Sequence, residues 1–382
     1  MNERVLILGG GMIGSAMALD LSRHGVAVCV ADVREETRAR LAQQLEIETV
    51  AADLSNPAAI QDLVRGYHVV IGALPSLLGL QTLRAVIEAG RNYVDISFMP
   101  EDALALAPLA RERGVTAVVD CGVAPGISNM MAGYATTVLD PCEELEIYVG
   151  GLPAERRWPF EYKAGFAPHD VIEEYVRPSR IVEHGRVVVR PALSEPERID
   201  FPGVGTLEAF NTDGLRSLAE TLRVPFMKEK TLRYPGHIET MRILRELGLF
   251  SKSPLVVAGQ AVRPFDVTAA LLFPMWQFEP GEADLTVLRV RARGRRDGVP
   301  TEYGWDMLDR YDPATGLRSM SRTTGFPATI VAGLLASGGF DRPGVHAPEA
   351  LGMQPGLLDF VLRELEARGV SCQASVTPLP PV

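Results

Sequence analysis

Three glycines in the stretch LGGGMIG, residues 8–14, have the spacing of a phosphate-binding turn between an apolar strand and a helix. Gly9 permits a tight turn, Gly11 lacks the Cβ that would block a pyrophosphate, and Gly14 lets helix and strand pack closely. A helix N-terminus offers free N–H groups to an anion. The same glycines would also suit a plain flexible turn. The candidate dinucleotide-binding residues here are Gly9, Gly11, Met12, Ile13 and Gly14.

An acidic residue follows the next expected strand, 26–30, at the offset typical of a ribose-binding carboxylate. Asp32 stands there, and a carboxylate in that place accepts hydrogen bonds from the adenosine ribose and repels a 2′-phosphate. The alternative is an ordinary surface aspartate. Arg34, two residues later, is a side chain that could meet such a phosphate. We therefore predict NAD as the cofactor, with the choice over NADP resting on Asp32.

The elements that must position these residues alternate in type through the first third of the chain. We expect further strands at 49–53, 68–74, 93–97 and 116–121, and helices at 57–65, 77–89 and 101–113. This rhythm predicts a Rossmann-type, doubly wound parallel sheet, whose ligands lie at the carboxyl ends of the strands. Further cofactor-binding candidates at those ends are Asp53, Ala73, Leu74, Pro75, Cys121 and Gly122.

Composition excludes several classes of protein. The formal net charge of −10 offers no basic field for nucleic acid, and no apolar run is long enough to span a membrane. The first strand begins almost at the N-terminus, so we expect no signal peptide and a cytoplasmic protein. The four cysteines lie far apart, so no metal site and no disulfide framework is expected.

The pattern changes after about residue 127. The segment LTVLRVRAR places Leu288, Val290 and Ala292 on one face of a strand and arginines on the other, which is typical of an antiparallel strand covered on one side. We interpret the arginine face as solvated. The 382 residues are enough for two domains. We predict a dinucleotide-binding domain at 1–127 and a mixed α+β substrate and dimerisation domain at 128–319, with helices from about 320–382 packing back on the first.

The motifs resemble those of a known family. The stretches LGGGMIG, VIGALPSLLG, YVDISFMPED, VVDCGVAPGISN, YVGGLP, DGLRS and TLRYPGH follow one another as in the saccharopine dehydrogenase/reductase group, and are most similar to its L-lysine 6-dehydrogenase branch. The resemblance implies a pyridine-nucleotide oxidoreductase of lysine catabolism, acting at a carbon that bears an amine. It implies a small amino-acid substrate, and we expect a homo-oligomer, with a dimer favoured.

Oxidation of a primary amine needs a neutral nitrogen. A lysine ammonium has a reference pKa near 10.4, so its deprotonation at pH 7 costs about 4.6 kcal/mol unless the site lowers that pKa. Water then attacks the iminium carbon and ammonia leaves. The semialdehyde cyclises onto its own α-amine to give piperideine-6-carboxylate.

Five side chains are candidates for this chemistry. Asp95 could hold the substrate ammonium or accept its proton, or could cap the next helix. His237 is expected to begin a helix that keeps its imidazole neutral and basic, or to be structural. Lys163 could lower the substrate's amine pKa, or could be a solvated lysine. Arg216 and Arg233 could grip the α-carboxylate, or could form structural ion pairs.

Cys121 is interpreted as a small buried residue beside the nicotinamide rather than a nucleophile. Two further functions stay open at this point. One is a saccharopine-type enzyme acting on a secondary amine, whose three substrate carboxylates need more cations. The other is an NAD-binding sensor that has lost catalysis.

Overall fold

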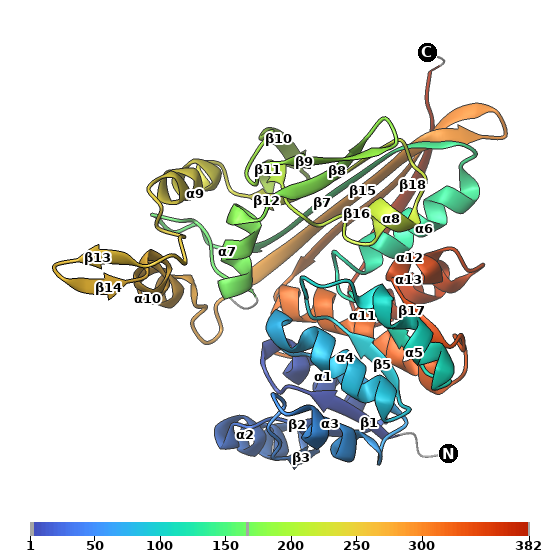
Figure 1. Cartoon of the computed structure of the whole chain (residues 1–382). Helices are drawn as coiled ribbons and strands as arrows, with labels where there is room; N and C mark the ends of the chain where they lie inside the picture. Colours follow the sequence, from blue (N-terminus) through green and yellow to red (C-terminus); the bar gives the residue numbers. More distant parts are fainter. Residues whose placement is uncertain (1–3, 166–167, 381–382) are drawn as a thin grey trace. The chain divides into compact units, whose positions relative to one another are not determined.

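The computed structural model describes residues 4–165 and 168–380 and divides into two compact units (Figure 1). The first comprises Met1–Thr137 and Ser321–Ser371, and the second Val138–Met320 and Cys372–Val382. The predicted boundary at residue 127 therefore falls at the start of a helix that still belongs to the first unit. The end of the chain, expected to pack on the first unit, divides between the two.

A parallel sheet forms the centre of the first unit, with strand order β17-β6-β5-β4-β1-β2-β3. The chain runs outward from β1 in both directions, which creates the switch point of a doubly wound fold. The central strands β1, β2 and β4 are almost wholly apolar and buried, as expected for a sheet covered on both faces. This confirms the predicted Rossmann architecture. The strands are β1 Arg4–Leu8, β2 Ala27–Ala31, β3 Glu48–Val50, β4 Val69–Gly72, β5 Asn92–Asp95, β6 Thr116–Val118 and β17 Gly344–His346.

Local signals mark the start of some helices of this unit. In α3, for example, the Asn56 side chain accepts a hydrogen bond from the Ala58 N–H at 3.0 Å, and Pro57 occupies the first turn. The predicted helix at 101–113 is divided into a 3₁₀ turn, η2 Ala103–Leu106, and α5. The helices are α1 Met12–Arg23, α2 Glu35–Leu45, α3 Pro57–Val64, α4 Gly79–Glu88, α5 Ala107–Glu112, α6 Ile127–Val138, α11 Ser319–Ala336, α12 Pro348–Gly352 and α13 Leu357–Ala367.

The second unit is built on a mixed nine-stranded sheet. Its main path is β10-β11-β12-β7-β15-β16-β18, with β8 pairing to β12 and β9 to β8. The β12–β7 pair is parallel and the others are antiparallel. The strands are β7 Cys142–Pro153, β8 Ser179–Glu183, β9 Arg186–Arg190, β10 Glu197–Phe201, β11 Gly205–Asn211, β12 Phe226–Arg233, β15 Asp284–Arg296, β16 Val299–Arg310 and β18 Cys372–Pro378.

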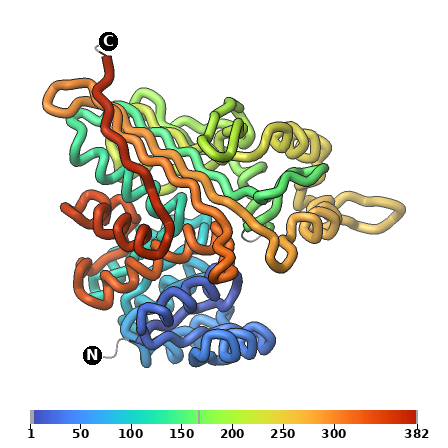
Figure 2. Tube along the Cα trace, turned by 180° about the vertical axis from the view of Figure 1, so that it is seen from behind, coloured from blue at the N-terminus to red at the C-terminus, as the bar shows by residue number. Residues whose placement is uncertain are grey.

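Four helices and a small ribbon accompany this sheet. The helices are α7 Pro168–Val176, α8 Leu218–Thr221, α9 His237–Glu246 and α10 Pro264–Trp276, and the ribbon pairs β13 Leu255–Val257 with β14 Gln260–Val262. Figure 2 shows the final strand, β18, lying along β16, with which it pairs from Thr301 to Met307. The C-terminal segment therefore extends the sheet of the second unit. Among the described residues, no helix is long and apolar enough to cross a bilayer.

The alternation predicted for β15 is correct, but its arginine face is not simply solvated. Leu288, Val290 and Ala292 are fully buried. Arg291 and Arg293 instead pair with acidic side chains of the neighbouring strands: Arg291 with Asp306, and Arg293 with both Glu302 and Glu144. The arginines are part of a charge ladder across the sheet, because cross-strand neighbours on one face lie within ion-pair distance.

Candidate functional site

The glycine turn of the first unit has the geometry that its sequence predicts. Gly9 has a φ of +102°, and a Cβ added there would lie 2.5 Å from the Ala73 carbonyl oxygen. A Cβ at Gly14 would lie 1.9 Å from the Gly9 carbonyl oxygen, so helix α1 approaches the turn too closely for any other residue. At Gly11 a Cβ would meet nothing within 4 Å. That open side, at the N-terminus of α1, is where an approaching pyrophosphate needs space.

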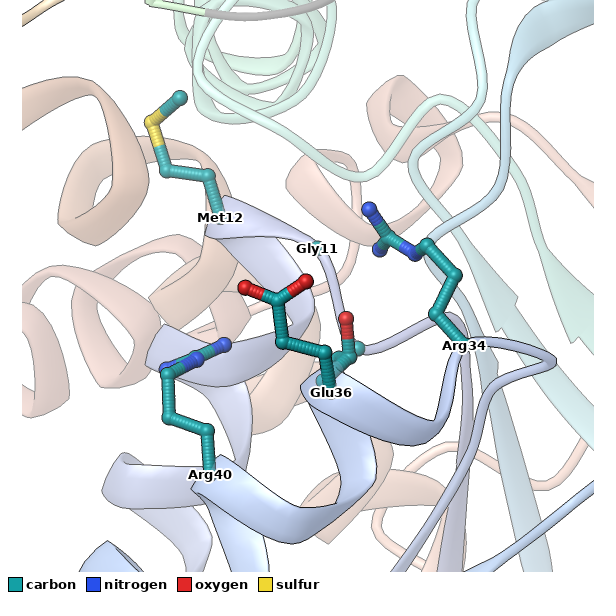
Figure 3. Close-up of a pocket in the computed structure, with 7 residues that line it drawn as sticks. Gly11, Met12, Arg34, Glu36 and Arg40 are labelled. Atoms are coloured by element: carbon teal, nitrogen blue, oxygen red, sulfur yellow. The ribbon is translucent and has the colours of Figure 1, made fainter.

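A hollow of about 260 Å³ opens beside this turn (Figure 3). It is lined by Gly10, Gly11, Met12, Arg34, Glu36, Thr37 and Arg40. Met12 is 38% exposed at its rim. Arg34, which precedes α2, and Arg40, within α2, each bring a guanidinium group to the hollow. The hollow therefore joins the helix N-terminus to the end of β2, as a dinucleotide requires.

Asp32, directly after β2, is held in place by its neighbours. One carboxylate oxygen, Oδ2, accepts the Gly10 N–H at 2.9 Å, and the other, Oδ1, accepts the Arg34 N–H at 2.9 Å. The Arg34 side chain adds a bond from Nε at 3.2 Å. Burial opposes ionisation, but the hydrogen bonds from Arg34 and Gly10 hold the pKa of Asp32 below its ordinary value. Asp32 is therefore ionised at neutral pH.

The remaining cofactor candidates lie at or beyond the strand ends. Gly122 and Cys121 are buried after β6, and the Cys121 N–H donates to the Asp95 carbonyl at 2.8 Å. Burial raises the pKa of the Cys121 thiol, so it is not a thiolate nucleophile. Strand β3 ends at Val50, three residues before the predicted end, and Asp53 lies in an exposed turn bonded to Ser55. Ala73, Leu74 and Pro75 follow β4 directly.

Asp95 ends β5 and is 1% exposed. Its Oδ1 accepts the Tyr93 hydroxyl at 2.9 Å, and its Oδ2 accepts both the backbone N–H and the hydroxyl of Ser97. Burial raises the pKa of Asp95 to about 7, although these hydrogen bonds oppose the shift. A carboxyl group with that pKa can carry or release a proton near neutral pH. Tyr93 and Ser97 were not predicted as partners: Tyr93 lies two residues before Asp95, on the same face of β5, and Ser97 follows the end of that strand.

A buried polar group in the second unit, which we call the β12 cluster, is formed by Glu229, Thr231 and Arg233 with Glu174 of α7 and Thr212. The three β12 side chains alternate along the strand and so share one face. Arg233 is 2% exposed and donates to Glu174 at 2.6 Å. Glu229 accepts the Thr212 hydroxyl at 2.6 Å, and burial raises the pKa of Glu229 to about 8. Sequence reasoning found only Arg233 in this cluster.

His237 begins α9, as predicted, and is buried beside the β12 cluster. Its Nδ1 faces the Phe160 carbonyl at 2.9 Å, and its Nε2 lies 2.9 Å from the Tyr175 hydroxyl. Burial, reinforced by the Arg233 charge, lowers the pKa of His237 to about 3. The imidazole is therefore neutral, with its proton on Nδ1 because a carbonyl can only accept. The ring of Tyr162 contacts both His237 and the Arg233 guanidinium.

Lys163 and Arg216 occupy other places in the second unit. The Lys163 ammonium group donates to Glu282 at 2.6 Å and to the Gln277 carbonyl at 2.8 Å. Arg216 is 8% exposed and has a φ of +54°, which is uncommon for a residue with a side chain. It follows Gly214, where a Cβ would lie 2.2 Å from the Glu229 carboxyl group. The loop that carries Arg216 is thus packed on the β12 cluster.

Comparison with known proteins agrees with this architecture. Residues 5–118 match the saccharopine dehydrogenase NADP binding domain, and residues 122–370 match the saccharopine dehydrogenase C-terminal domain. The chain belongs to the saccharopine dehydrogenase family. The members of this family are oxidoreductases with a pyridine-nucleotide-binding domain. The predicted family is confirmed.

Several relatives define the range of this similarity. The chain is 28% identical over 286 residues to the mouse mitochondrial alpha-aminoadipic semialdehyde synthase, a match that covers 69% of this chain but only 30% of that protein. It is 26% identical to carboxynorspermidine synthase of Vibrio cholerae, covering 75% and 73% of the two chains. It is 22% identical to the L-glutamate-forming, NADP(+) saccharopine dehydrogenase of Pyricularia oryzae, covering 98% and 99%.

The fold likeness extends over the whole chain. The apo saccharopine dehydrogenase (L-Glu forming) from Saccharomyces cerevisiae superimposes with a TM-score of 0.80 at 18% identity, covering 98% of this chain and all of that one. At this identity the likeness concerns the fold. Within the described residues, no group of three or more His, Cys, Asp or Glu side chains is placed to hold a metal ion.

Proposed function

We propose that this chain is an NAD-dependent dehydrogenase that oxidises the 6-amino group of L-lysine. The product would be the semialdehyde, which cyclises to piperideine-6-carboxylate. Membership of an oxidoreductase family supports the reaction class. We also propose that the enzyme acts in the cytoplasm, in lysine catabolism.

The observation that carries the choice of substrate is the charge balance of the second unit. The cations Lys163, Arg180 and Arg233 each already hold a carboxylate of this chain, namely Glu282, Asp213 and Glu174. The β12 cluster adds a further buried carboxyl group, that of Glu229, which its raised pKa of about 8 keeps largely uncharged at neutral pH. Such a unit suits a substrate with two amino groups and one carboxylate better than saccharopine, with its three carboxylates.

The residues of the first unit fit a dinucleotide. The open side of Gly11 leaves space for a pyrophosphate, the α1 N-terminus faces it, and Asp32 is ionised for the ribose hydroxyl groups. Bound there, the nicotinamide supplies the acceptor for the hydride that leaves the amine carbon. Asp32 favours NAD because its charge repels a 2′-phosphate, whereas two relatives carry NADP(+) in their names.

The chain's own groups would prepare the amine. With a pKa of about 7, Asp95 can take a proton from the substrate ammonium when its bonds to Tyr93 and Ser97 rearrange. His237 is neutral, and its Nε2 becomes a base only when the Tyr175 hydroxyl turns away. Lys163 would lower the amine pKa only to the extent that Glu282 leaves its charge uncompensated. Arg216 and Arg233 are the proposed carboxylate ligands, and Arg233 could act as one only when its bond to Glu174 opens.

A second candidate is an enzyme acting on a secondary amine, which the names of the saccharopine dehydrogenases and of carboxynorspermidine synthase favour. One assay separates the two. NADH formation is followed at 340 nm with lysine, saccharopine and ornithine supplied separately, and then repeated with NADP. Lysine as the best substrate supports the proposal. Saccharopine as the best substrate overturns it in favour of the second candidate, and binding of NAD without turnover of any amine indicates a sensor.

A further inference from the structure

The hollow beside the glycine turn lies between the first turns of two helices. Gly11 is the N-cap of α1 and Arg34 that of α2, and neither of these two caps contributes a side-chain hydrogen bond. The first backbone N–H groups of a helix have no partner within the helix, and the helix dipole adds partial positive charge there. Met12 of α1 and Glu36 of α2, both in a first turn, line the hollow. The backbone around the hollow therefore favours an anion.

Two arginines add full positive charges to the hollow. Arg34 donates from Nε to the Asp32 carboxylate at 3.2 Å, so its charge is shared with that group. Arg40 donates to the hydroxyl oxygen of Ser15 at 2.9 Å, a neutral partner. Ser15 in turn donates to the Gly10 carbonyl at 2.9 Å, which links Arg40 to the phosphate-binding turn. Two guanidinium groups beside two helix starts are the chemistry of a phosphate site.

The chain directs a carboxylate of its own into this hollow. Figure 3 shows the Glu36 side chain extending toward the turn at Gly11, with the guanidinium groups of Arg34 and Arg40 on either side. The pKa of Arg34 is raised chiefly by its hydrogen bond with Asp32, and the nearby charge of Glu36 adds to this. The hydrogen bonds of the two arginines nevertheless go to Asp32 and to Ser15 rather than to Glu36. Glu36 is thus an anion among cations that are bonded elsewhere.

A phosphate on the adenosine 2′-oxygen would meet this carboxylate. Asp32 is placed for the ribose hydroxyl groups, so a group attached to the 2′-oxygen would reach past Asp32 into the hollow that Arg34 and Glu36 line. Such a phosphate carries about −1.5 to −2 charges at pH 7. The Asp32 charge is partly compensated by bonds from the Gly10 N–H and from Arg34, whereas that of Glu36 is not. Glu36 is therefore the stronger source of repulsion within the hollow.

We propose that Glu36 determines cofactor specificity: its carboxylate takes the place of a 2′-phosphate between Arg34 and Arg40 and so excludes NADP. NAD, with a free 2′-hydroxyl, has no group that reaches the hollow. A repulsive element of this kind separates two ligands whose other contacts are the same. The proposal rests on the proposed function only in that a dinucleotide binds at the glycine turn, and it does not depend on which amine is oxidised.

The test measures what the 2′-phosphate adds to binding. Calorimetric titration of the full chain gives the dissociation constants of NAD and NADP, and of 5′-AMP and adenosine 2′,5′-bisphosphate, two fragments that differ only in this phosphate. Glu36→Gln keeps the size of an exposed side chain and removes its charge. We expect this variant to bind NADP and the bisphosphate roughly tenfold or more tightly than the wild type does, because a like-charge contact is lost. Its affinities for NAD and 5′-AMP should not change.

A matched control is Glu35→Gln, in the same helical turn, at a side chain that is 82% exposed and pairs with Arg38 outside the hollow. It should leave all four dissociation constants unchanged. A third protein combines Glu36→Gln with Arg40→Met and should lose most of the gain in NADP affinity, because one of the two cations that would hold the phosphate is gone.

Three results would overturn the inference: a gain for Glu36→Gln no larger than that for Glu35→Gln, an equal gain for 5′-AMP and the bisphosphate, or a gain that survives Arg40→Met in full. The wild type distinguishes this failure from failure of the proposed function. A wild type that binds neither nucleotide, or that prefers NADP, refutes the proposed cofactor and this inference together. Tight binding of NAD with an unchanged NADP affinity in Glu36→Gln refutes the inference alone.

Discussion

The Nε2 atom of His237 lies 2.9 Å from the hydroxyl oxygen of Tyr175, while the Nδ1 atom of the same ring faces the Phe160 carbonyl. Both nitrogens are therefore occupied in a buried environment that lowers the pKa of His237 to about 3. A histidine with that pKa stays neutral from pH 5 upward. It cannot be the source of a pH dependence at neutral or alkaline pH.

The first prediction concerns the pH profile of lysine oxidation. We expect kcat/KM to rise between pH 7 and 10, because the neutral share of the substrate amine grows tenfold per pH unit. His237→Asn should lower the rate but keep the rise at the same pH, since His237 does not titrate there. Profiles of both proteins are compared under conditions in which chemistry limits the rate. A flat wild-type profile would refute amine deprotonation, and loss of the rise in the variant alone would make His237 the titrating group.

The second prediction concerns the cofactor. NAD should bind more tightly than NADP, because the ionised Asp32 repels a 2′-phosphate. Asp32→Ala should reduce the difference in affinity between NAD and NADP. Arg34→Ala should weaken the binding of NADP more than that of NAD, by roughly tenfold or more, because loss of a charge-assisted bond costs about 1.5–3 kcal/mol. Fluorescence titration of each variant with both nucleotides measures this, and equal or reversed affinities in the wild type would show that Asp32 does not decide the choice.

The doubly wound sheet could be predicted from the sequence because buried parallel strands are continuous aliphatic runs, and because the glycine spacing marks the first strand-to-helix turn. Strand β17 could not be predicted in this way. Its three residues, Gly344–His346, reach the sheet edge beside β6 from more than 200 positions away, and so short a segment has no periodicity of its own.

The candidate site could likewise be predicted only in part from the sequence. The positions of Asp95 and His237 follow from local signals, a strand end and a helix start. Their hydrogen-bond partners do not, because Phe160, Tyr175 and Glu174 come from separate segments that tertiary packing brings together. Charge alone made Lys163 and Arg233 candidates, whereas only the structure reveals that each is already paired.

The third prediction concerns Glu229. Burial raises the pKa of this carboxyl group to about 8, from an ordinary value of 4.5. Between pH 4.5 and 8 the folded chain binds a proton at Glu229 that the unfolded chain has already released. The free energy of unfolding therefore falls as the pH rises through this range, by up to about 1.4 kcal/mol per pH unit. Glu229→Gln cannot titrate. Its unfolding free energy, measured by denaturant titration at pH 5.5, 7 and 8.5, should fall less steeply than that of the wild type.

A matched control for this measurement is Glu239→Gln, at a side chain of α9 that is 68% exposed. It makes the same change of side chain at the surface and should leave the wild-type slope unchanged. If Glu229→Gln and the wild type lose stability in parallel, Glu229 is ionised in the folded chain throughout this range and the β12 cluster is more strongly solvated than its burial indicates.

The last prediction concerns the binding of the substrate carboxylate. Arg216 lies on the loop that packs on Glu229, and a planar guanidinium holds a carboxylate in a fixed orientation. Arg216→Ala should lower kcat/KM for lysine by roughly tenfold to more than a hundredfold, which corresponds to about 1.5–3 kcal/mol, and Arg216→Lys should restore only part of the loss. NAD affinity should not change. Arg233 is a less specific probe, because its removal leaves Glu174 buried without its partner, at a cost of about 3–5 kcal/mol in stability.

Cadaverine separates a substrate contact from a structural effect, because it has the chain and both amines of lysine but no carboxylate. The wild type should use cadaverine poorly, and Arg216→Ala should be little worse than the wild type with it, since the interaction that the variant lacks is one that cadaverine never makes. Equal losses on lysine and cadaverine would mean that Arg216 supports the fold of its loop. Full activity of Arg216→Ala on lysine would leave Arg233 as the candidate carboxylate ligand, to be tested by Arg233→Lys with the unfolding free energy measured alongside.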